Sequence, residues 1–151
     1  VELVDWGLKK KIGKYAYFVA GIKAWLGALP NVDAVNGALR ASGPLALVGN
    51  GRFYGGTWAL FPLADLQDGL LEVSVFPSLS FVGAARGVCG LLTNSLYKVG
   101  GVKHFRAESV ELSSNAPVWL QLDGENVCPL PARLSVRRRA LRVLCPAFAK
   151  R

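Results

Sequence analysis

The chain has 151 residues, ordinarily the length of one domain and enough to bury roughly 70% of the surface of the unfolded chain. Hydrophobic residues make up 52% of it and charged residues 19%, so the composition excludes intrinsic disorder and predicts a well-filled core. Eighteen basic residues against ten acidic ones give a formal charge of +8, which favours anionic partners (phosphate groups, acidic lipid surfaces or nucleic acid) without choosing among them.

The first predicted element is a helix from Leu8 to Leu29, whose apolar residues recur at helical spacing until Pro30 stops it. Its apolar part, Tyr15 to Leu29, contains Lys23 and is shorter than the ~20 residues that cross a bilayer. It also lacks the small-residue cleavage pattern of a signal peptide. The chain contains no methionine and starts inside what looks like a folded element, so we expect it to be a piece of a longer protein.

Short strands dominate the rest of the chain. Asn36-Gly37 is a strong hairpin signal between two expected strands at 32–35 and 38–40. A second helix is expected from Ser80 to about Leu92, weakened by its glycines. The other expected strands are Leu45–Val48, Thr57–Phe61, Leu70–Phe76, Phe105–Leu112, Val118–Leu122, Arg133–Val136 and Leu141–Leu144, with turns at Asn115–Pro117, Asp123-Gly124 and Pro129–Pro131. This order predicts a single domain over 1–151, mainly β, with a sandwich-like or barrel-like core and two helices.

Three cysteines, Cys89, Cys128 and Cys145, have no metal-ligand spacing. An odd number without such spacing is typical of reduced thiols in a cytosolic protein, and we expect these three to fill the core.

A glycine-rich run, Gly49 to Gly56, follows the expected strand at 45–48. No Gly-Lys-Ser/Thr follows it, and the next element is a strand, so it matches neither a phosphate-binding P-loop nor a dinucleotide fingerprint. Glycines at this density serve either a tight strand connection or a close approach of the backbone to a ligand.

Asp65 and Asp68 lie three residues apart in a loop bracketed by Pro62 and Gly69. Mg²⁺ takes oxygen ligands, commonly one or two carboxylates supplemented by carbonyls and water, and such a loop could supply them. The alternative is that both aspartates only cap turns.

Asp123-Gly124-Glu125 places two carboxylates at a turn between strands. Asp-Gly is a preferred dipeptide of the type I′ hairpin, which is the structural explanation. In the functional interpretation Glu125 is a general base and Asp123 is a polar partner that orients the reacting group.

The order of these motifs resembles the C-terminal domain of the diacylglycerol kinase, sphingosine kinase and YegS-like lipid kinase family. The matching residues are Gly13, Tyr17, Gly21 and Ile22; Asn50 with Gly55 and Gly56; Pro62, Ala64, Asp68, Gly69 and Leu70; and Asp123, Gly124 and Glu125. The resemblance covers almost the whole chain and implies a β-sandwich domain. The family's Gly-Gly-Asp-Gly nucleotide motif, which belongs to an N-terminal α/β domain, does not occur here.

The resemblance implies an ATP-dependent and Mg²⁺-dependent lipid kinase whose substrates lie in a cleft between two domains, so this chain alone is expected to be inactive. Asp68 would hold a metal ion, with main-chain oxygens near Asp65 and Leu70. Asn50, Gly55 and Gly56 would approach the nucleotide. Glu125 would face the cleft as base or polar organiser, supported by Asp123. The implied partners are a lipid such as diacylglycerol or a sphingoid base, the N-terminal domain and a membrane surface, and a homo-oligomer is compatible with this arrangement.

The basic cluster of Lys9, Lys10, Lys11 and Lys14 is either a membrane contact of a peripheral cytoplasmic enzyme or a solvated helical turn. Arg137-Arg138-Arg139 is expected to be an exposed turn rather than a phosphate site, and His104, the only histidine, to have an ordinary surface or loop role. The alternative function is a non-catalytic basic β-module that binds anionic ligands, lipid surfaces or nucleic acid. Tyr54, Trp58 and Trp119 have few basic neighbours in sequence, which does not favour nucleic acid.

Overall fold

The computed structural model describes residues 29–54, 58–78 and 98–144, together with residues 86, 87, 89, 90, 93 and 95. The helix predicted from Leu8 lies outside the described residues except for its last residue. The predicted helix from Ser80 lies mostly outside them, although Arg86, Gly87, Cys89 and Gly90 are described and helical. The strands are β1 (Val32–Asn36), β2 (Leu39–Gly43), β3 (Leu45–Gly49), β4 (Phe53–Tyr54), β5 (Trp58–Ala59), β6 (Leu71–Phe76), β7 (Lys103–Ala107), β8 (Ser109–Ser114), β9 (Trp119–Leu122), β10 (Glu125–Pro129) and β11 (Ala132–Ser135).

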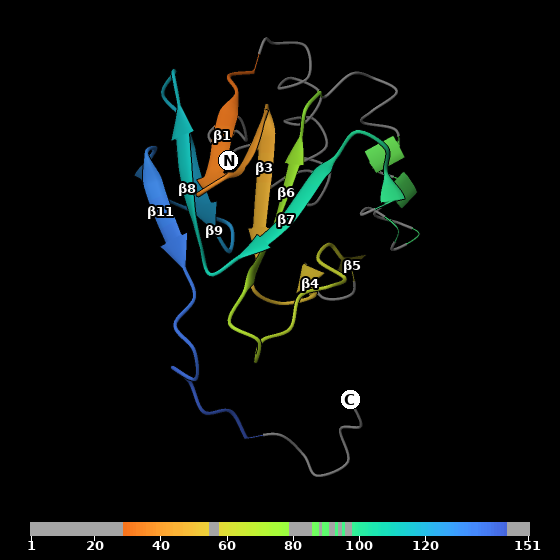
Figure 1. The fold of residues 1–151 in the computed structure, drawn as a ribbon, viewed down its shortest axis with the longest axis vertical. Helices are drawn as coiled ribbons and strands as arrows, with labels where there is room; N and C mark the ends of the chain where they lie inside the picture. The colour runs from red at the N-terminus through yellow and green to blue at the C-terminus, as the bar shows by residue number, and fades with distance from the viewer. Residues whose placement is uncertain are drawn as a thin grey trace, which may run out of the picture.

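Two antiparallel sheets form the body of the domain (Figure 1). One sheet has the strand order β11-β8-β1-β2 and the other the order β3-β6-β7. Two smaller two-stranded sheets, β9–β10 and β4–β5, complete the described part. The main core cluster joins the two large sheets, because it combines inward residues of β1, β2 and β8 with those of β6: Val32, Ala34, Ala41, Val110, Leu112, Leu71, Val73 and Val75. The predicted β-sandwich is confirmed.

Alternation of side chains produces most of this core. Val110 and Leu112 on β8 are buried whereas Glu111 between them is exposed, which is the pattern of a strand with one face on the core. Strand β6 differs, because all six of its residues are buried, including Glu72 and Ser74. On its second face, Phe76 packs in a small cluster with Leu60, Phe61 and Ala64 of the loop after β5.

The first hairpin forms as predicted, but its turn lies one residue later. Asn36 pairs with Leu39, so the two-residue loop is Gly37-Ala38, with a φ of 55° at Gly37. Asn36 stays in the strand because its side-chain amide Nδ2 donates a hydrogen bond of 2.7 Å to the carbonyl of Ser109 on the neighbouring β8.

The single strand predicted from Phe105 to Leu112 is wrong: it is two strands that belong to different sheets. The break falls at Glu108. Up to Ala107 the inward residues have odd numbers, and from Val110 they have even numbers. Because strand side chains alternate with a period of two, this change of phase requires an irregular residue between the strands.

Three other expectations differ from the structure, two of them at the C-terminal end. The strand predicted at Leu141–Leu144 is wrong, since the segment is irregular and Leu144 is fully exposed. Strand β10 was not predicted, and it reaches Pro129, where a turn was expected. The strand predicted at Thr57–Phe61 is shortened to β5, paired with β4.

The cysteines do not fill the core as predicted. Cys89 is exposed and Cys128 is half-buried, and neither forms a disulfide bond. Cys145 lies outside the described residues.

Candidate functional site

An apolar cavity of about 420 Å³ lies between β3, β9 and the sheet that contains β1, β8 and β11. Strands distant in sequence bound it: its lining includes Ala46 and Val48 of β3, Leu120 of β9, and Leu134 of β11. Its few polar lining residues include Gln121 and Asp123, so the cavity is apolar with a carboxylate in its lining. A volume of this order is typical of small-molecule sites. A second hollow of about 380 Å³ lies over β1, β8 and β11, but Glu111, Ser113 and Arg133 make it more polar.

The Asp123-Gly124 step is a hairpin turn. Leu122 pairs with Glu125, and both loop residues have positive φ, 49° at Asp123 and 97° at Gly124. Positive φ at both positions is the signature of a type I′ turn, so the structural explanation of this dipeptide is confirmed. Both carboxylates are exposed, but Asp123 lines the cavity and Glu125 on β10 does not.

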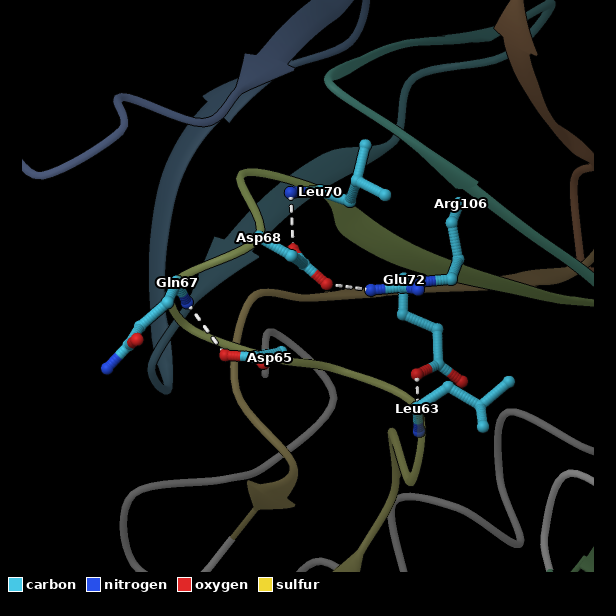
Figure 2. A network of polar contacts seen from close by, with 7 residues as sticks. All are labelled: Leu63, Asp65, Gln67, Asp68, Leu70, Glu72 and Arg106. Atoms are coloured by element: carbon cyan, nitrogen blue, oxygen red, sulfur yellow. Dashed lines mark hydrogen bonds and ion pairs between the residues drawn. The ribbon is translucent and has the colours of Figure 1, made fainter. Parts of the chain in front are cut away.

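The two aspartates of the loop after β5 each hold a turn (Figure 2). The carboxylate Oδ1 of Asp65 accepts a hydrogen bond of 2.9 Å from the amide of Gln67, and Oδ1 of Asp68 accepts one of 2.8 Å from the amide of Leu70. The amide of Asp68 itself donates to the carbonyl of Asp65 at 3.3 Å. Both aspartates therefore cap turns of the same loop.

Arg106 and Glu72, which sequence reasoning did not single out, complete this network (Figure 2). The Nη2 atom of Arg106 donates to Oδ2 of Asp68, and the two side chains form an ion pair. Glu72 lies directly opposite Arg106 in the β6–β7 ladder, and its Oε2 accepts a hydrogen bond of 3.0 Å from the amide of Leu63. The alternation of β6 could have identified Glu72 as a candidate, because it places this carboxylate on the face of the sheet opposite the valines. Its burial depends on the loop that covers it.

Burial raises the pKa of Glu72 above its ordinary value, and the amide of Leu63, the charge of Arg106 and the amide of Ala64 oppose this shift, in that order of importance. Among the described residues, the Nε of Arg106 is buried without a hydrogen-bond partner. Because this nitrogen carries a hydrogen and has no free lone pair, its missing partner is an acceptor such as an oxygen and not a cation.

The predicted metal ligands form no ready site for a divalent cation, because protein donors already occupy most of their oxygens. Both carboxylate oxygens of Asp68, Oδ1 of Asp65 and the carbonyl of Asp65 already accept hydrogen bonds. In the described ranges, no three Asp, Glu, His or Cys side chains gather closely enough to hold a metal ion. A cation at this loop would compete with the guanidinium of Arg106 for the negative charge of Asp68.

The glycine-rich run is only partly described. The hydrogen on Gly49 faces the ring of Phe61, because a Cβ built there would lie 2.2 Å from Cδ2 of that ring. Gly49 therefore has a packing role. Asn50 is exposed in the bend that follows β3, and Gly55 and Gly56 lie outside the described residues.

The remaining candidates have surface roles. The Nδ1 atom of His104 lies 2.9 Å from Oγ of the buried Ser74, and burial lowers the pKa of this histidine. Arg138 pairs with Glu108 at 3.1 Å within an exposed turn, as predicted for the arginine run. The lysine cluster at residues 9–14 lies outside the described residues.

Two packed antiparallel sheets with an apolar cavity between strands define the class of this chain as a β-sandwich domain. Residues 7–145 match the family described as the YegS C-terminal NAD kinase beta sandwich-like domain, and the chain belongs to this family. It is 35% identical over 155 aligned positions to a probable lipid kinase YegS-like protein of Stenotrophomonas maltophilia, with 95% of this chain and 48% of that protein covered. A Pseudomonas putida protein of the same description is 33% identical, with 93% and 46% covered. The chain thus spans about half the length of the curated relatives that it matches.

Solved structures support the fold. A diacylglycerol kinase structure from Bacillus anthracis superimposes with a TM-score of 0.54 at 17% identity, over 78% of this chain and 43% of that one. Another chain from the same organism gives 0.64 at 19% identity, over 89% and 45%. In the part of the chain that the structure describes, no helix has the length and apolar character that crossing a bilayer requires.

Proposed function

We propose that this chain is the lipid-binding part of an ATP-dependent lipid kinase, which works together with an N-terminal nucleotide-binding domain. The observation that carries the proposal is the apolar cavity with Asp123 in its lining. Family membership and relatives described as probable lipid kinases support it. The chain alone would lack the nucleotide site and be inactive.

The cavity matches the apolar part of a lipid with one chain. An apolar cavity of about 150 Å³ binds benzene, which corresponds to about 25 Å³ for each carbon atom. At the same density, a cavity of about 420 Å³ holds roughly 17 carbon atoms. Each buried methylene contributes about 0.8 kcal/mol, so a fatty chain would supply most of the binding energy. The substrate class that we propose is therefore a hydroxylated lipid whose single chain enters the cavity and whose hydroxyl stays near Asp123.

The chemistry would consist mainly of positioning. The lipid oxygen attacks the γ-phosphorus of ATP, the bond from that phosphorus to the bridging oxygen breaks, and ADP leaves. Asp123 in the cavity lining would orient the hydroxyl, and Glu125, which lies outside that lining in this chain, would accept its proton once the N-terminal domain completes the cleft. Asn50, Gly55 and Gly56 are proposed to face the nucleotide. Mg²⁺ would neutralise phosphate charge when bound with ATP.

Two carboxamide substitutions in the full-length protein test these roles through phosphate transfer from ATP to lipid. Glu125→Gln is expected to lower turnover by at least roughly 100-fold, the usual contribution of a general base. Asp123→Asn keeps the turn, because Asn-Gly also favours type I′, and is expected to lower turnover through loss of the charge alone. Glu111→Gln removes an exposed carboxylate on β8 and is the control. Unchanged turnover in Glu125→Gln would remove that residue from the mechanism.

A cavity-filling substitution tests the lipid site separately. Ala46 lines the cavity from β3, so Ala46→Phe should reduce the acceptable chain length. We expect long-chain substrates to lose activity while short-chain analogues keep it, measured over a series of single-chain and two-chain lipids. Equal losses at every chain length would contradict the cavity as the chain-binding site. Anionic-vesicle binding without phosphate transfer to any lipid would favour the non-catalytic module instead.

A further inference from the structure

A guanidinium lies where the family resemblance places a cation. Asp68 was expected to bind a metal ion, yet its Oδ2 accepts a hydrogen bond from Nη2 of Arg106 and its Oδ1 from the amide of Leu70. Mg²⁺ needs free oxygen ligands in near-octahedral order, whereas a guanidinium supplies directed N–H donors and always carries its charge. With one donor on each oxygen, the negative charge of this carboxylate is already balanced by the guanidinium, which weakens its attraction for a cation.

The sheet fixes this guanidinium in place. Arg106 is the fourth residue of β7 and lies directly opposite Glu72 of β6, so its side chain leaves the sheet on the face that the loop covers. Glu72 is only 2% exposed and binds the amide of Leu63 at the start of the loop, while Arg106 binds Asp68 near the loop's end. Two side chains facing each other across one strand pair therefore hold both ends of the same loop (Figure 2).

A second arginine adds positive charge beside the same turn. A Cβ on Gly69 would lie 2.2 Å from Nε of Arg138, so this side chain covers the turn directly after Asp68. Arg138 is held there by an ion pair of 3.1 Å with Glu108. A divalent cation approaching Asp68 would meet the positive charge of Arg106 directly, with the side chain of Arg138 over the next residue, and both disfavour its binding.

We infer that Arg106 acts in this chain as a built-in counter-ion for Asp68 and Glu72, and that the loop 61–70 needs no divalent cation to fold onto β6 and β7. Arg106 is a positioning residue, because it fixes the loop and not a substrate. The inference is independent of the kinase proposal, since it concerns stability and metal binding and not phosphate transfer.

Thermal unfolding of the full-length protein, treated with chelator and then given millimolar Mg²⁺ or Ca²⁺, tests the inference. The wild-type melting temperature should not change with either ion. Arg106→Gln should melt at lower temperature and recover part of the loss when the ion is added, because Asp68 then becomes available to it. Arg133→Gln is the matched control, since Arg133 also lies opposite a glutamate across a strand pair, but at the surface.

Three results would overturn the inference. One is stabilisation of the wild-type protein by Mg²⁺ or Ca²⁺ that disappears in Asp68→Asn. Another is a melting temperature for Arg106→Gln no lower than that of Arg133→Gln. If Arg106→Gln does not fold, equilibrium dialysis of the wild-type protein decides the question: absence of a bound divalent cation supports the inference, and one ion per chain that is lost in Asp68→Asn overturns it.

Discussion

At the scale of single residues, the glycines of this domain serve two different physical needs. Gly49 has no positive φ but lies against the ring of Phe61, so any side chain at this position would overlap that ring. Gly69 has a φ of 73° and lies beneath the flexible side chain of Arg138, so the backbone conformation is what requires glycine there. A glycine-rich sequence alone does not distinguish these cases from a ligand-binding loop, because the neighbours come from distant parts of the chain.

Gly49→Ala should therefore destabilise the domain by about 1–3 kcal/mol, the usual effect of overpacking, since its Cβ would overlap the ring of Phe61. Gly100→Ala is the control, because nothing lies within 4 Å of its Cβ position and its φ is not positive. Urea denaturation measures both, and the control should remain within about 0.5 kcal/mol of the wild-type protein. Equal stability of the two variants would contradict the packing role of Gly49.

His104 should make stability depend on pH. Burial lowers its pKa below the ordinary value of 6.5, so below pH 6.5 the unfolded chain takes up the proton more readily than the folded one. The free energy of unfolding should therefore decrease as the pH drops below 6.5. Above pH 6.5, His104 should not change it. The effect should be small because the residue is still exposed to solvent.

Melting curves at pH values on both sides of 6.5 for the wild-type protein and His104→Gln isolate this contribution. Glu72, whose pKa is raised, acts in the opposite sense: its contribution is present below pH 4.5 and is lost as the pH rises through its folded pKa. It is common to both proteins and cancels in the comparison. Identical pH profiles would show that His104 does not contribute.

At the scale of elements, the position of β6 was predicted correctly from the sequence, but the burial of both of its faces was not. Its sequence alternates apolar residues with Glu72 and Ser74, which predicts one buried and one solvated face. In the structure both faces are buried. The strand's position was predictable from alternation within six residues, whereas the burial of Glu72 depends on the loop 61–70 and on Arg106, thirty-four positions later in the chain.

The β9–β10 hairpin gives an element-scale prediction. Gly124 has a φ of 97° and no atom within 4 Å of its Cβ position, so Gly124→Ala introduces backbone strain without a steric clash. We expect a loss of about 1–2 kcal/mol, the penalty of a left-handed conformation for an L-residue. The free energy of unfolding in urea measures it, and Gly100→Ala is again the control. A loss no larger than that of the control would contradict a rigid type I′ turn.

At the scale of the whole molecule, positive charge and apolar side chains meet on the segment 137–144. Leu141, Val143 and Leu144 are at least 70% exposed, and four arginines lie among them or just before them. We propose that this segment contributes to a peripheral membrane contact, since each basic residue near an anionic surface is worth about 1 kcal/mol.

Co-sedimentation with phosphatidylserine-containing vesicles tests this contact. Binding should weaken as salt is added, because screening shortens the range of the attraction. The double variant Arg137→Gln/Arg139→Gln should bind more weakly than Arg40→Gln/Arg133→Gln, which removes the same charge from the sandwich. Equal losses in the two double variants would show that net charge, and not this segment, governs binding.

The sequence by itself determined the β class, most of the strands, the turn at Asp123-Gly124 and the family resemblance, because alternation and turn dipeptides act over a few neighbouring residues. The tertiary structure alone decided that Arg106 neutralises Asp68, that the strand predicted across Glu108 divides between two sheets, and that Asp123 rather than Glu125 lines the cavity. These features depend on strand register and sheet packing, which bring together residues far apart in the chain. Local sequence patterns do not contain that information.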